Sequence, residues 1–224
     1  MDLKFPQQYS QGRRVNESPI MYVFDQFISP EECRGLIASA GDDMQRSSVC
    51  AGKGGVKHDC RTSTTQWVPH NTNHLTQTIS DRVSRLVGLG LEHAEALQLI
   101  HYQTEQEYRA HHDAWDLNSE VGKRCTQRGG QRMLTCLIYL NKVEEGGGTG
   151  FPQLDLEVRS QEGRMLVFHN CLPGTDTLHP DTLHSGLPVL KGEKWAINLW
   201  FREKALRSIK PPAYKTTGFK RVIE

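Results

Sequence analysis

The sequence predicts a mainly β fold, a double-stranded β-helix or jelly roll, with N-terminal helices packed against one of its two sheets. Two amphipathic helical patterns come first, before residue 92. Short segments rich in β-forming residues follow, separated by turn clusters at residues 146–150 and 188–192. Helices followed by many short strands indicate an antiparallel double sheet that can hold a ligand between its layers.

The first part of the chain supplies the helices. Residues 20–27 read as a strand, and Ser29-Pro30-Glu31-Glu32 then provides an N-cap, a first-turn proline and first-turn acids. Apolar residues at four-residue steps predict a second helix over residues 71–87. Between the helices, the glycines and scattered charge of residues 48–63 predict an exposed loop.

The remaining segments are predicted strands. They lie at residues 65–68, 97–103, 108–113, 133–140, 154–158, 164–169 and 195–202. We therefore expect a folded domain over residues 20–204, in which 20–95 form a helical support region and 96–204 the jelly-roll core. Residues 1–19 would be an N-terminal extension and residues 205–224 a basic tail.

Composition excludes several classes of partner. The 224 residues include 27 basic and 26 acidic side chains, so no net field attracts nucleic acid or an anionic membrane surface. No apolar run approaches the roughly 20 residues that span a bilayer, and the polar start lacks the apolar core of a secretory signal. These observations predict a soluble cytoplasmic protein.

The six cysteines show neither a CxxC pair nor a regular zinc spacing. In a cytoplasmic chain of this size we expect mostly free thiols. Cys50 and Cys60 flank a glycine-rich turn, so a disulfide bond between them stays open.

A metal site is predicted from Tyr108-Arg109-Ala110-His111-His112-Asp113. Residues two apart in a strand share a face, so His111 and Asp113 can bind one metal while His112 points away. With a second histidine, for which we assign His184, they form the facial set that leaves open positions on Fe(II). His179-Pro180-Asp181 has the same spacing, but Pro180 and its loop-like surroundings argue against a strand there.

Lys194 lies ten residues beyond His184, after a turn that contains Pro188 and Gly192. Such a turn lets two strands run back beside each other, so Lys194 can face the metal cavity. A partly buried ammonium suits the far carboxylate of a diacid that chelates iron by its other end. Without the metal motif, a solvated lysine would be the simpler interpretation.

These motifs together resemble the prolyl 4-hydroxylases of the Fe(II)/2-oxoglutarate dioxygenase superfamily. The resemblance rests on Tyr102 nine residues before His111, on the segment at 131–152 with its Glu144-Glu145-Gly146-Gly147-Gly148 turn, and on the segment at 182–202. Weaker similarity reaches back to about residue 20. Lysine at position 194 is similar to the collagen-type branch rather than to the arginine-bearing oxygen-sensor branch.

The resemblance implies a mechanism and a set of site residues. Fe(II) would be held by His111, Asp113 and His184, and 2-oxoglutarate by Lys194, Tyr102 and Thr135. O2 would be the second co-substrate and ascorbate the reductant, with succinate and CO2 released. Peptide-contacting residues would lie in the groove and in the loops at 48–63 and 115–130; they are Tyr108, Trp200 and Arg61, with Arg124 or Arg128.

The implied substrate is a proline-containing peptide or protein, converted to 4-hydroxyproline by a monomer or homodimer. One alternative keeps the chemistry but acts on a free amino acid or on nucleic acid, and the near-neutral charge disfavours nucleic acid. Another is a non-catalytic metal-binding jelly-roll module. The joint presence of His111, Asp113, His184 and Lys194 disfavours that reading.

Overall fold

A computed structural model describes residues 5–41, 44–50, 55–56 and 59–206, without the side chains of residues 49–50 and 55–56. The helices are α1 (Pro30–Ala38), α2 (His74–Val87) and α3 (Glu120–Cys125), with short 3-10 turns η1 (Leu91–His93), η2 (Pro152–Leu154) and η3 (Pro180–Thr182). The predicted basic tail lies almost entirely outside the described residues.

Strands make up most of the ordered structure. They are β1 (Arg13–Asn16), β2 (Met21–Phe24), β3 (Gln45–Arg46), β4 (Val49–Cys50), β5 (Gly55–Val56), β6 (Thr64–Val68), β7 (Leu97–Tyr102), β8 (Tyr108–His111), β9 (Arg132–Tyr139), β10 (Glu145–Gly146), β11 (Thr149–Phe151), β12 (Leu156–Val158), β13 (Met165–His169), β14 (His184–Gly186), β15 (Val189–Lys191) and β16 (Lys194–Arg202).

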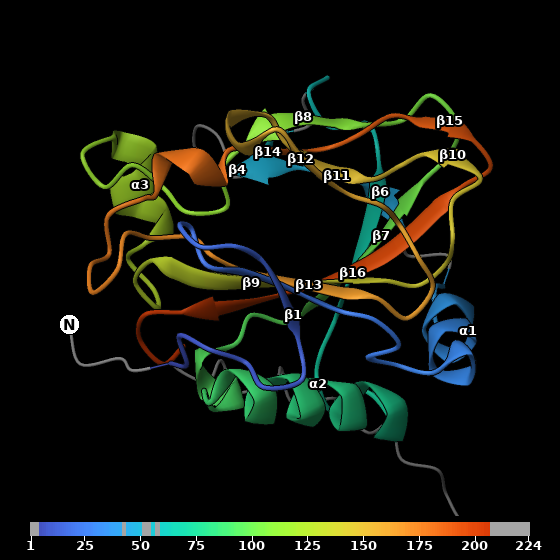
Figure 1. Ribbon diagram of the computed structural model, residues 1–224, viewed down its shortest axis with the longest axis horizontal. Helices are drawn as coiled ribbons and strands as arrows, with labels where there is room; N and C mark the ends of the chain where they lie inside the picture. Colours follow the sequence, from blue (N-terminus) through green and yellow to red (C-terminus); the bar gives the residue numbers. More distant parts are fainter. Residues whose placement is uncertain (1–4, 42–43, 51–54, 57–58, 207–224) are drawn as a thin grey trace, which may run out of the picture.

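Two sheets face each other, as the sequence predicted. Within the described residues the large sheet has the order β1-β2-β13-β9-β16-β7-β6-β3 and the small one the order β12-β11-β14-β8. Every pairing is antiparallel. Figure 1 shows the small sheet above the large one, with α2 lying along the opposite face of the large sheet. The jelly roll with helices against one sheet is therefore confirmed.

Local sequence explains where the helices begin. Ser29 accepts a hydrogen bond from the backbone of Glu32, whose side chain accepts one from the backbone of Ser29, which forms a capping box. In α2 the cap is Asn73, so the helix begins three residues later than the start of its predicted range at 71. It ends at Gly88, whose φ of 66° is one that glycine adopts without strain.

Two cores hold the layers together. The larger one joins the apolar faces of α1 and α2 to the large sheet, for example through Leu36, Ile79 and Val83. The second lies between the two sheets and includes Tyr139 and Phe168. The helices are thus a support on the outer side, and the space between the sheets is left for a site.

Several expectations about elements need correction. The strand expected over 108–113 ends at His111, so Asp113 follows the strand. The expected loop 48–63 contains the β4–β5 hairpin, and 115–130 contains α3. The supposed extension 1–19 contributes β1 to the large sheet and the buried Tyr9 to its core. Short strands of this kind depend on partners distant in the sequence, so local patterns do not reveal them.

Candidate active site

A cavity of about 480 Å³ opens between the two sheets. Alternate residues of β16 line it, namely Lys194, Ala196, Asn198 and Trp200, as expected for one face of a strand. Strands β7 and β9 complete the floor, and β8 and β14 of the small sheet form the opposite wall. All but two of the residues that the sequence proposed for metal, co-substrate or peptide binding line this cavity.

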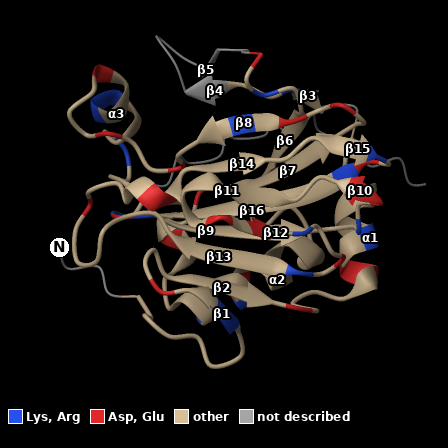
Figure 2. Cartoon of the chain, turned by 45° about the horizontal axis from the view of Figure 1, so that its top comes forward, with Lys and Arg blue, Asp and Glu red and all other residues tan. Residues whose placement is uncertain are grey.

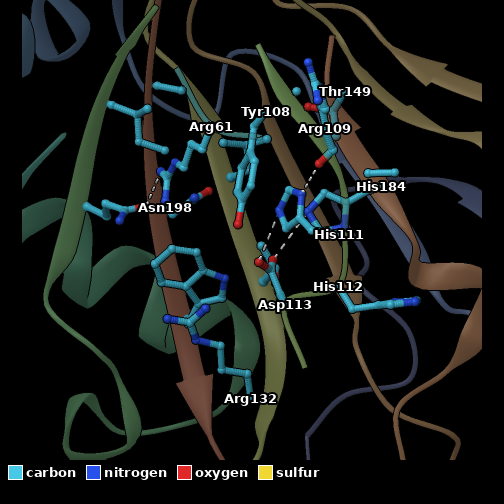
Figure 3. A pocket seen from close by; sticks show the side chains of 18 of the residues that line it. Arg61, Tyr108, Arg109, His111, His112, Asp113, Arg132, Thr149, His184 and Asn198 are labelled. Carbon is cyan, nitrogen blue, oxygen red and sulfur yellow. Dashed lines mark hydrogen bonds and ion pairs between the residues drawn. The ribbon is translucent and has the colours of Figure 1, made fainter. Parts of the chain in front are cut away.

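Three of its side chains form a compact cluster. His111, Asp113 and His184 each offer one ligand atom, and these atoms lie within 4.8 Å of one another. The Nε2 atoms of His111 and His184 lie 3.9 and 3.7 Å from the carboxylate oxygens of Asp113. Figure 3 shows the three side chains converging. Pairing of β8 with β14 brings the two histidines together, because His184 is the cross-strand partner of His111.

Both imidazoles are oriented by the main chain. The Nδ1–H of His111 donates to the carbonyl of Arg109 (2.8 Å), and that of His184 donates to the carbonyl of Thr182 (2.9 Å). Each ring therefore presents Nε2 toward Asp113. Burial, followed by the proximity of His184, holds the pKa of His111 well below its usual 6.5. A neutral imidazole with one nitrogen fixed as donor is the form that binds a metal.

The carboxylate is oriented by a side chain. The hydroxyl of Thr135 on β9 donates to Oδ2 of Asp113 at 2.7 Å. Burial alone would raise the pKa of Asp113, but His184, His111 and Arg132 around it lower that pKa. The group is thus an anion, shielded from solvent and 5% exposed.

This donor set fits Fe(II). Two imidazole nitrogens and one carboxylate oxygen match the facial triad of non-haem iron oxygenases, which leaves further coordination positions open. A closed zinc site of the structural type would need a fourth protein ligand, and no other histidine, cysteine, aspartate or glutamate of the described chain joins this cluster.

The two competing histidines lie outside the cluster. His112 points away from Asp113 in Figure 3 and hydrogen-bonds the hydroxyl of Thr182 at 3.2 Å. His179 caps the turn η3, where it accepts from the backbone of Asp181 and contacts the hydroxyl of Ser18. The geometry therefore separates the three predicted ligands from both imitations.

Lys194 lies in the same cavity and is 2% exposed. Its ammonium donates to the carbonyl of Gly148 (3.3 Å) and lies 5.3 Å from the ring of Tyr102. No carboxylate of the described residues forms an ion pair with it. Burial lowers the pKa of Lys194 to about 7, so an anion beside it would restore the charge.

Two polar residues beside Lys194 were not singled out by the sequence. Tyr139 has its ring 5.4 Å from the ammonium, and its hydroxyl donates to Oγ1 of Thr149 at 2.7 Å. Thr149 lines the cavity and is buried. Alternation along β9 from Thr135 and Leu137 could have found Tyr139, but the pairing of β11 with β14 that places Thr149 had no local signal.

Aromatic and guanidinium groups line the opposite end. The ring of Tyr108 is stacked on His111, with centroids 3.5 Å apart, and Arg61 lies over it at 4.7 Å. Trp200 is covered by Arg132 at 3.8 Å and lies 6.1 Å from Trp67. Trp67 is 48% exposed, so this end of the cavity presents an apolar surface to solvent.

Of the three arginines considered for peptide contact, Arg61 lines the cavity, whereas Arg124 and Arg128 do not. Arg132 does line it, and its guanidinium forms a two-pronged ion pair with Glu95 (2.7 and 2.8 Å). By strict alternation along β9, the side chain of Arg132 would point away from the cavity floor. It lines the cavity nonetheless, because the register shifts where Arg202 of β16 pairs with it. A sequence argument from alternation would therefore have missed it.

The cysteines follow the expectation in part. Cys33, Cys136 and Cys171 are free and buried. Cys125, at the end of α3, is disulfide-bonded, so it is an exception to the expected free thiols. The side chain of Cys50 lies outside the described residues, so the structure does not test a Cys50–Cys60 disulfide bond.

Figure 2 shows basic and acidic residues interspersed over the strands and helices. Among the helices that the structure describes, none has the length and apolar character needed to cross a membrane.

Comparisons with known proteins point to one family. Residues 97–202 match the 2OG-Fe(II) oxygenase superfamily. A protein of Acanthamoeba polyphaga mimivirus, classed with the prolyl 4-hydroxylases, is 35% identical over 82% of this chain and 74% of its own length. Prolyl 4-hydroxylase 1 of Arabidopsis thaliana is 34% identical over 85% of this chain and 71% of its own.

A solved structure agrees with these relatives. The viral collagen prolyl hydroxylase of Paramecium bursaria Chlorella virus-1, in its 2OG complex, superimposes with a TM-score of 0.65 at 27% identity. The match covers 81% of this chain and 95% of that one. A prolyl-4-hydroxylase of Pseudomonas putida has the same fold, with a TM-score of 0.56.

Proposed function

This chain belongs to the prolyl 4-hydroxylases of the 2OG-Fe(II) oxygenase superfamily, and on that basis we propose that it converts prolyl residues of a peptide or protein to 4-hydroxyproline. The chain is a 2-oxoglutarate-dependent dioxygenase with Fe(II) and O2 as its other requirements. The observation that supports the proposal most is the location of the His111, Asp113 and His184 cluster and of the buried cation Lys194 in one cavity.

In this proposal, His111, Asp113 and His184 hold the iron. Bound Fe(II), together with 2-oxoglutarate and O2, supplies the oxidation, and the co-substrate leaves as succinate and CO2. The protein keeps the reacting atoms oriented and excludes water, which the enclosed position between two sheets favours. In the free protein, burial already favours the neutral form of His111, and the neighbouring charges favour the ionised form of Asp113.

Lys194 pairs with the far carboxylate of 2-oxoglutarate. A buried ammonium whose described partners are a carbonyl and two aromatic rings gains most from a carboxylate at that point. Tyr102 and Thr135 remain the predicted hydrogen-bond partners of the co-substrate, and Thr149 joins them because its hydroxyl hydrogen is not committed to Tyr139, which is the donor in their contact.

The peptide lies against Tyr108, Trp200 and Arg61. Flat aromatic faces suit a proline-containing segment in an extended left-handed helix, whose rigid shape costs little entropy on binding. Trp67 extends the same surface outward, because its ring lies beside Trp200 and is half-exposed. The buried guanidinium of Arg61 is held by Gln98 (3.1 Å) and Ser63 (3.3 Å), and faces the cavity for a peptide carbonyl.

The remaining parts of the proposal concern the setting of the reaction. Ascorbate is the reductant that rescues turnovers without substrate. The protein acts in the cytoplasm, as a monomer or homodimer, on a peptide partner and without nucleic acid or membrane.

The test measures succinate and hydroxyproline formation with Fe(II), 2-oxoglutarate and a panel of proline-containing peptides. We expect the parent to hydroxylate at least one peptide and the His184→Ala variant to hydroxylate none. Free proline and other amino acids form the second arm of the panel. Hydroxylation of a free amino acid in place of every peptide would overturn the peptide assignment while leaving the dioxygenase chemistry intact.

A further inference from the structure

Two buried side chains, Asn170 and Thr135, form a line of hydrogen bonds that reaches the carboxylate of Asp113. Asn170 follows β13 and is completely buried. Its Nδ2 donates to Oγ1 of Thr135 at 2.9 Å, and Thr135 donates to Oδ2 of Asp113 at 2.7 Å. Three segments distant in the sequence thus meet in one line of hydrogen bonds.

The number of available hydrogens and the contact distances decide which group donates in each hydrogen bond of this line. The hydroxyl of Thr135 has one hydrogen, and its two acceptors within reach are Oδ2 of Asp113 at 2.7 Å and Oδ1 of Asn170 at 3.3 Å. The shorter contact, to a charged acceptor, is the stronger one. The amide of Asn170 reinforces it, because donating to the oxygen of Thr135 turns the hydroxyl hydrogen toward Asp113.

The position of Asn170 leaves its side chain little freedom. Its backbone N–H donates to Met133, and its carbonyl accepts from His179, each at 2.9 Å. Thr135 is equally fixed, because it pairs with Phe168 of β13 on one side and with Trp200 of β16 on the other. The line therefore does not depend on a mobile loop.

Asp113 differs in this respect from the two histidines. His111 and His184 are held by main-chain carbonyls two residues earlier in the chain, which any side chain at those positions would provide. Asp113 follows the end of β8, and its Oδ2 accepts a hydrogen bond from the side chain of Thr135. Its rotation about the Cβ–Cγ bond thus depends on neighbouring side chains, which are Thr135, supported by Asn170, and Trp200.

We propose that Asn170 is a positioning residue for the carboxylate of Asp113, acting through the hydroxyl of Thr135. The inference rests on the proposed function, because it takes Asp113 as a metal ligand. Asn170 keeps Thr135 a donor, and Thr135 occupies one lone pair of Oδ2, so that the carboxylate presents a fixed set of lone pairs to the metal. Partners of this kind typically contribute about 10-fold to 100-fold in metal affinity.

The experiment is a double-mutant cycle on metal binding, read without turnover. Co(II) is titrated into the metal-free full chain and followed by its visible absorption. The variants are Asn170→Ala, Thr135→Val and both together. We expect each single change to weaken Co(II) binding about 10-fold, and the double variant to bind no more weakly than Thr135→Val alone. Non-additivity arises because Asn170 has no route to Asp113 once the hydroxyl is gone.

Controls separate positioning from general loss of structure. Ser160→Ala removes another buried hydroxyl, which donates to the carbonyl of Asn141 away from the cavity, and we expect it to bind Co(II) like the parent. Thr135→Ser keeps the hydroxyl and stays within about threefold of the parent. Asn170→Asp keeps the shape but replaces the donor by an acceptor, and weakens Co(II) binding even if Asn170→Ala does not fold.

The outcomes are distinct. Parent-like Co(II) affinity in the folded Asn170→Ala or Asn170→Asp variant overturns the inference, as do losses that multiply in the double variant. If the folded parent itself fails to bind Co(II), or binds it unchanged after His184→Ala, the proposed function fails and the inference fails with it. If the parent hydroxylates a peptide but the Asn170 variants bind Co(II) as tightly as the parent does, the inference about Asn170 fails and the proposed function stands.

Discussion

His184 of β14 lies directly opposite His111 of β8, as its Cα partner in an antiparallel pair, and the two ring centroids are 4.3 Å apart. The side chains of opposite residues lie on the same face of a sheet. A shift of register by one residue would turn one of the imidazoles to the other face. The pairing of two short strands therefore determines whether the metal site exists.

The first prediction compares neighbouring histidines. His111→Ala removes one of the three donors, so we expect Co(II) and Fe(II) binding and hydroxylation to be lost. His112→Ala removes a side chain that hydrogen-bonds Thr182 outside the cluster, and we expect metal binding and measurable hydroxylation to persist. Metal titration of both variants checks this. Loss of metal binding in the His112 variant, together with retained metal binding in the His111 variant, would show that His112 and not His111 faces the metal.

The second prediction removes the cation. Lys194→Ala leaves the far carboxylate of 2-oxoglutarate without its partner in a buried site, which costs about 3 kcal/mol, or roughly 100-fold in KM for 2-oxoglutarate. We expect metal binding to be unchanged, because Lys194 does not belong to the His111, Asp113 and His184 cluster. Steady-state kinetics against 2-oxoglutarate and a Co(II) titration distinguish the two effects. An unchanged KM would show that the co-substrate binds elsewhere.

The third prediction concerns pH. The pKa of Lys194 is lowered to about 7 by burial in the free protein, so the charged form is lost as pH rises through that value. Because 2-oxoglutarate binds the charged form, the protein must take up a proton to bind above pH 7. We expect KM for 2-oxoglutarate to rise about 10-fold per pH unit above that pKa.

The matched control is Lys194→Arg, whose guanidinium stays charged throughout this range. In that variant the rise of KM for 2-oxoglutarate above pH 7 should disappear. A parent KM that stays flat from pH 6.5 to 9, or a rise that persists in the arginine variant, would assign the pH dependence to another group.

The fourth prediction concerns Thr149. Thr149→Val removes a hydroxyl that lines the cavity next to Gly148, whose carbonyl accepts from Lys194. We expect KM for 2-oxoglutarate to rise about 10-fold, the effect of one charge-assisted hydrogen bond. Ser160→Ala, which removes a buried hydroxyl outside the cavity, serves as its control. Equal kinetics for the Thr149 variant and the parent would exclude Thr149 from the co-substrate site.

The fifth prediction concerns stability. Glu95 accepts from both Arg132 and Arg202, and its Oε1 lies 2.7 and 2.9 Å from their nitrogens. Glu95→Gln leaves two largely buried guanidinium groups without a carboxylate, and we expect unfolding free energy to fall by about 3 kcal/mol. Glu107→Gln, in an exposed pair with Arg109, should cost less than about 1 kcal/mol. Urea unfolding of both variants measures the difference, and equal losses would contradict the argument.

Sequence patterns were reliable where a long segment has one periodicity. The helix α2 and the strands β7, β9 and β16 were predicted to within a few residues, because apolar spacing and caps are local properties. Strands of two or three residues, such as β11 and β15, overlap the segments at 146–150 and 188–192 that were predicted as turns. Their hydrogen bonds depend on partners far away in the chain, so no local signal marks them.

The site divides in the same way. The three proposed ligands and Lys194 were chosen from residue type and spacing, and they lie in one cavity, although the predicted reason was incomplete, because β8 ends before Asp113. What orients Asp113 after the strand has ended is Thr135, a residue that the sequence offered only as a co-substrate contact. Tyr139, Thr149 and Arg132 became neighbours of the site only once the strands were paired.

The sequence by itself therefore determined the fold class, the proposed donor atoms and the proposed cation, since periodicity and residue chemistry are local properties of the chain. The tertiary structure alone decided that His111 and His184 face each other, that His112 and His179 do not take part, and that Asn170 reaches Asp113 through Thr135. The physical reason is that hydrogen bonds between strands and between buried side chains join residues far apart in sequence, and their register is set by the packing of the whole sheet.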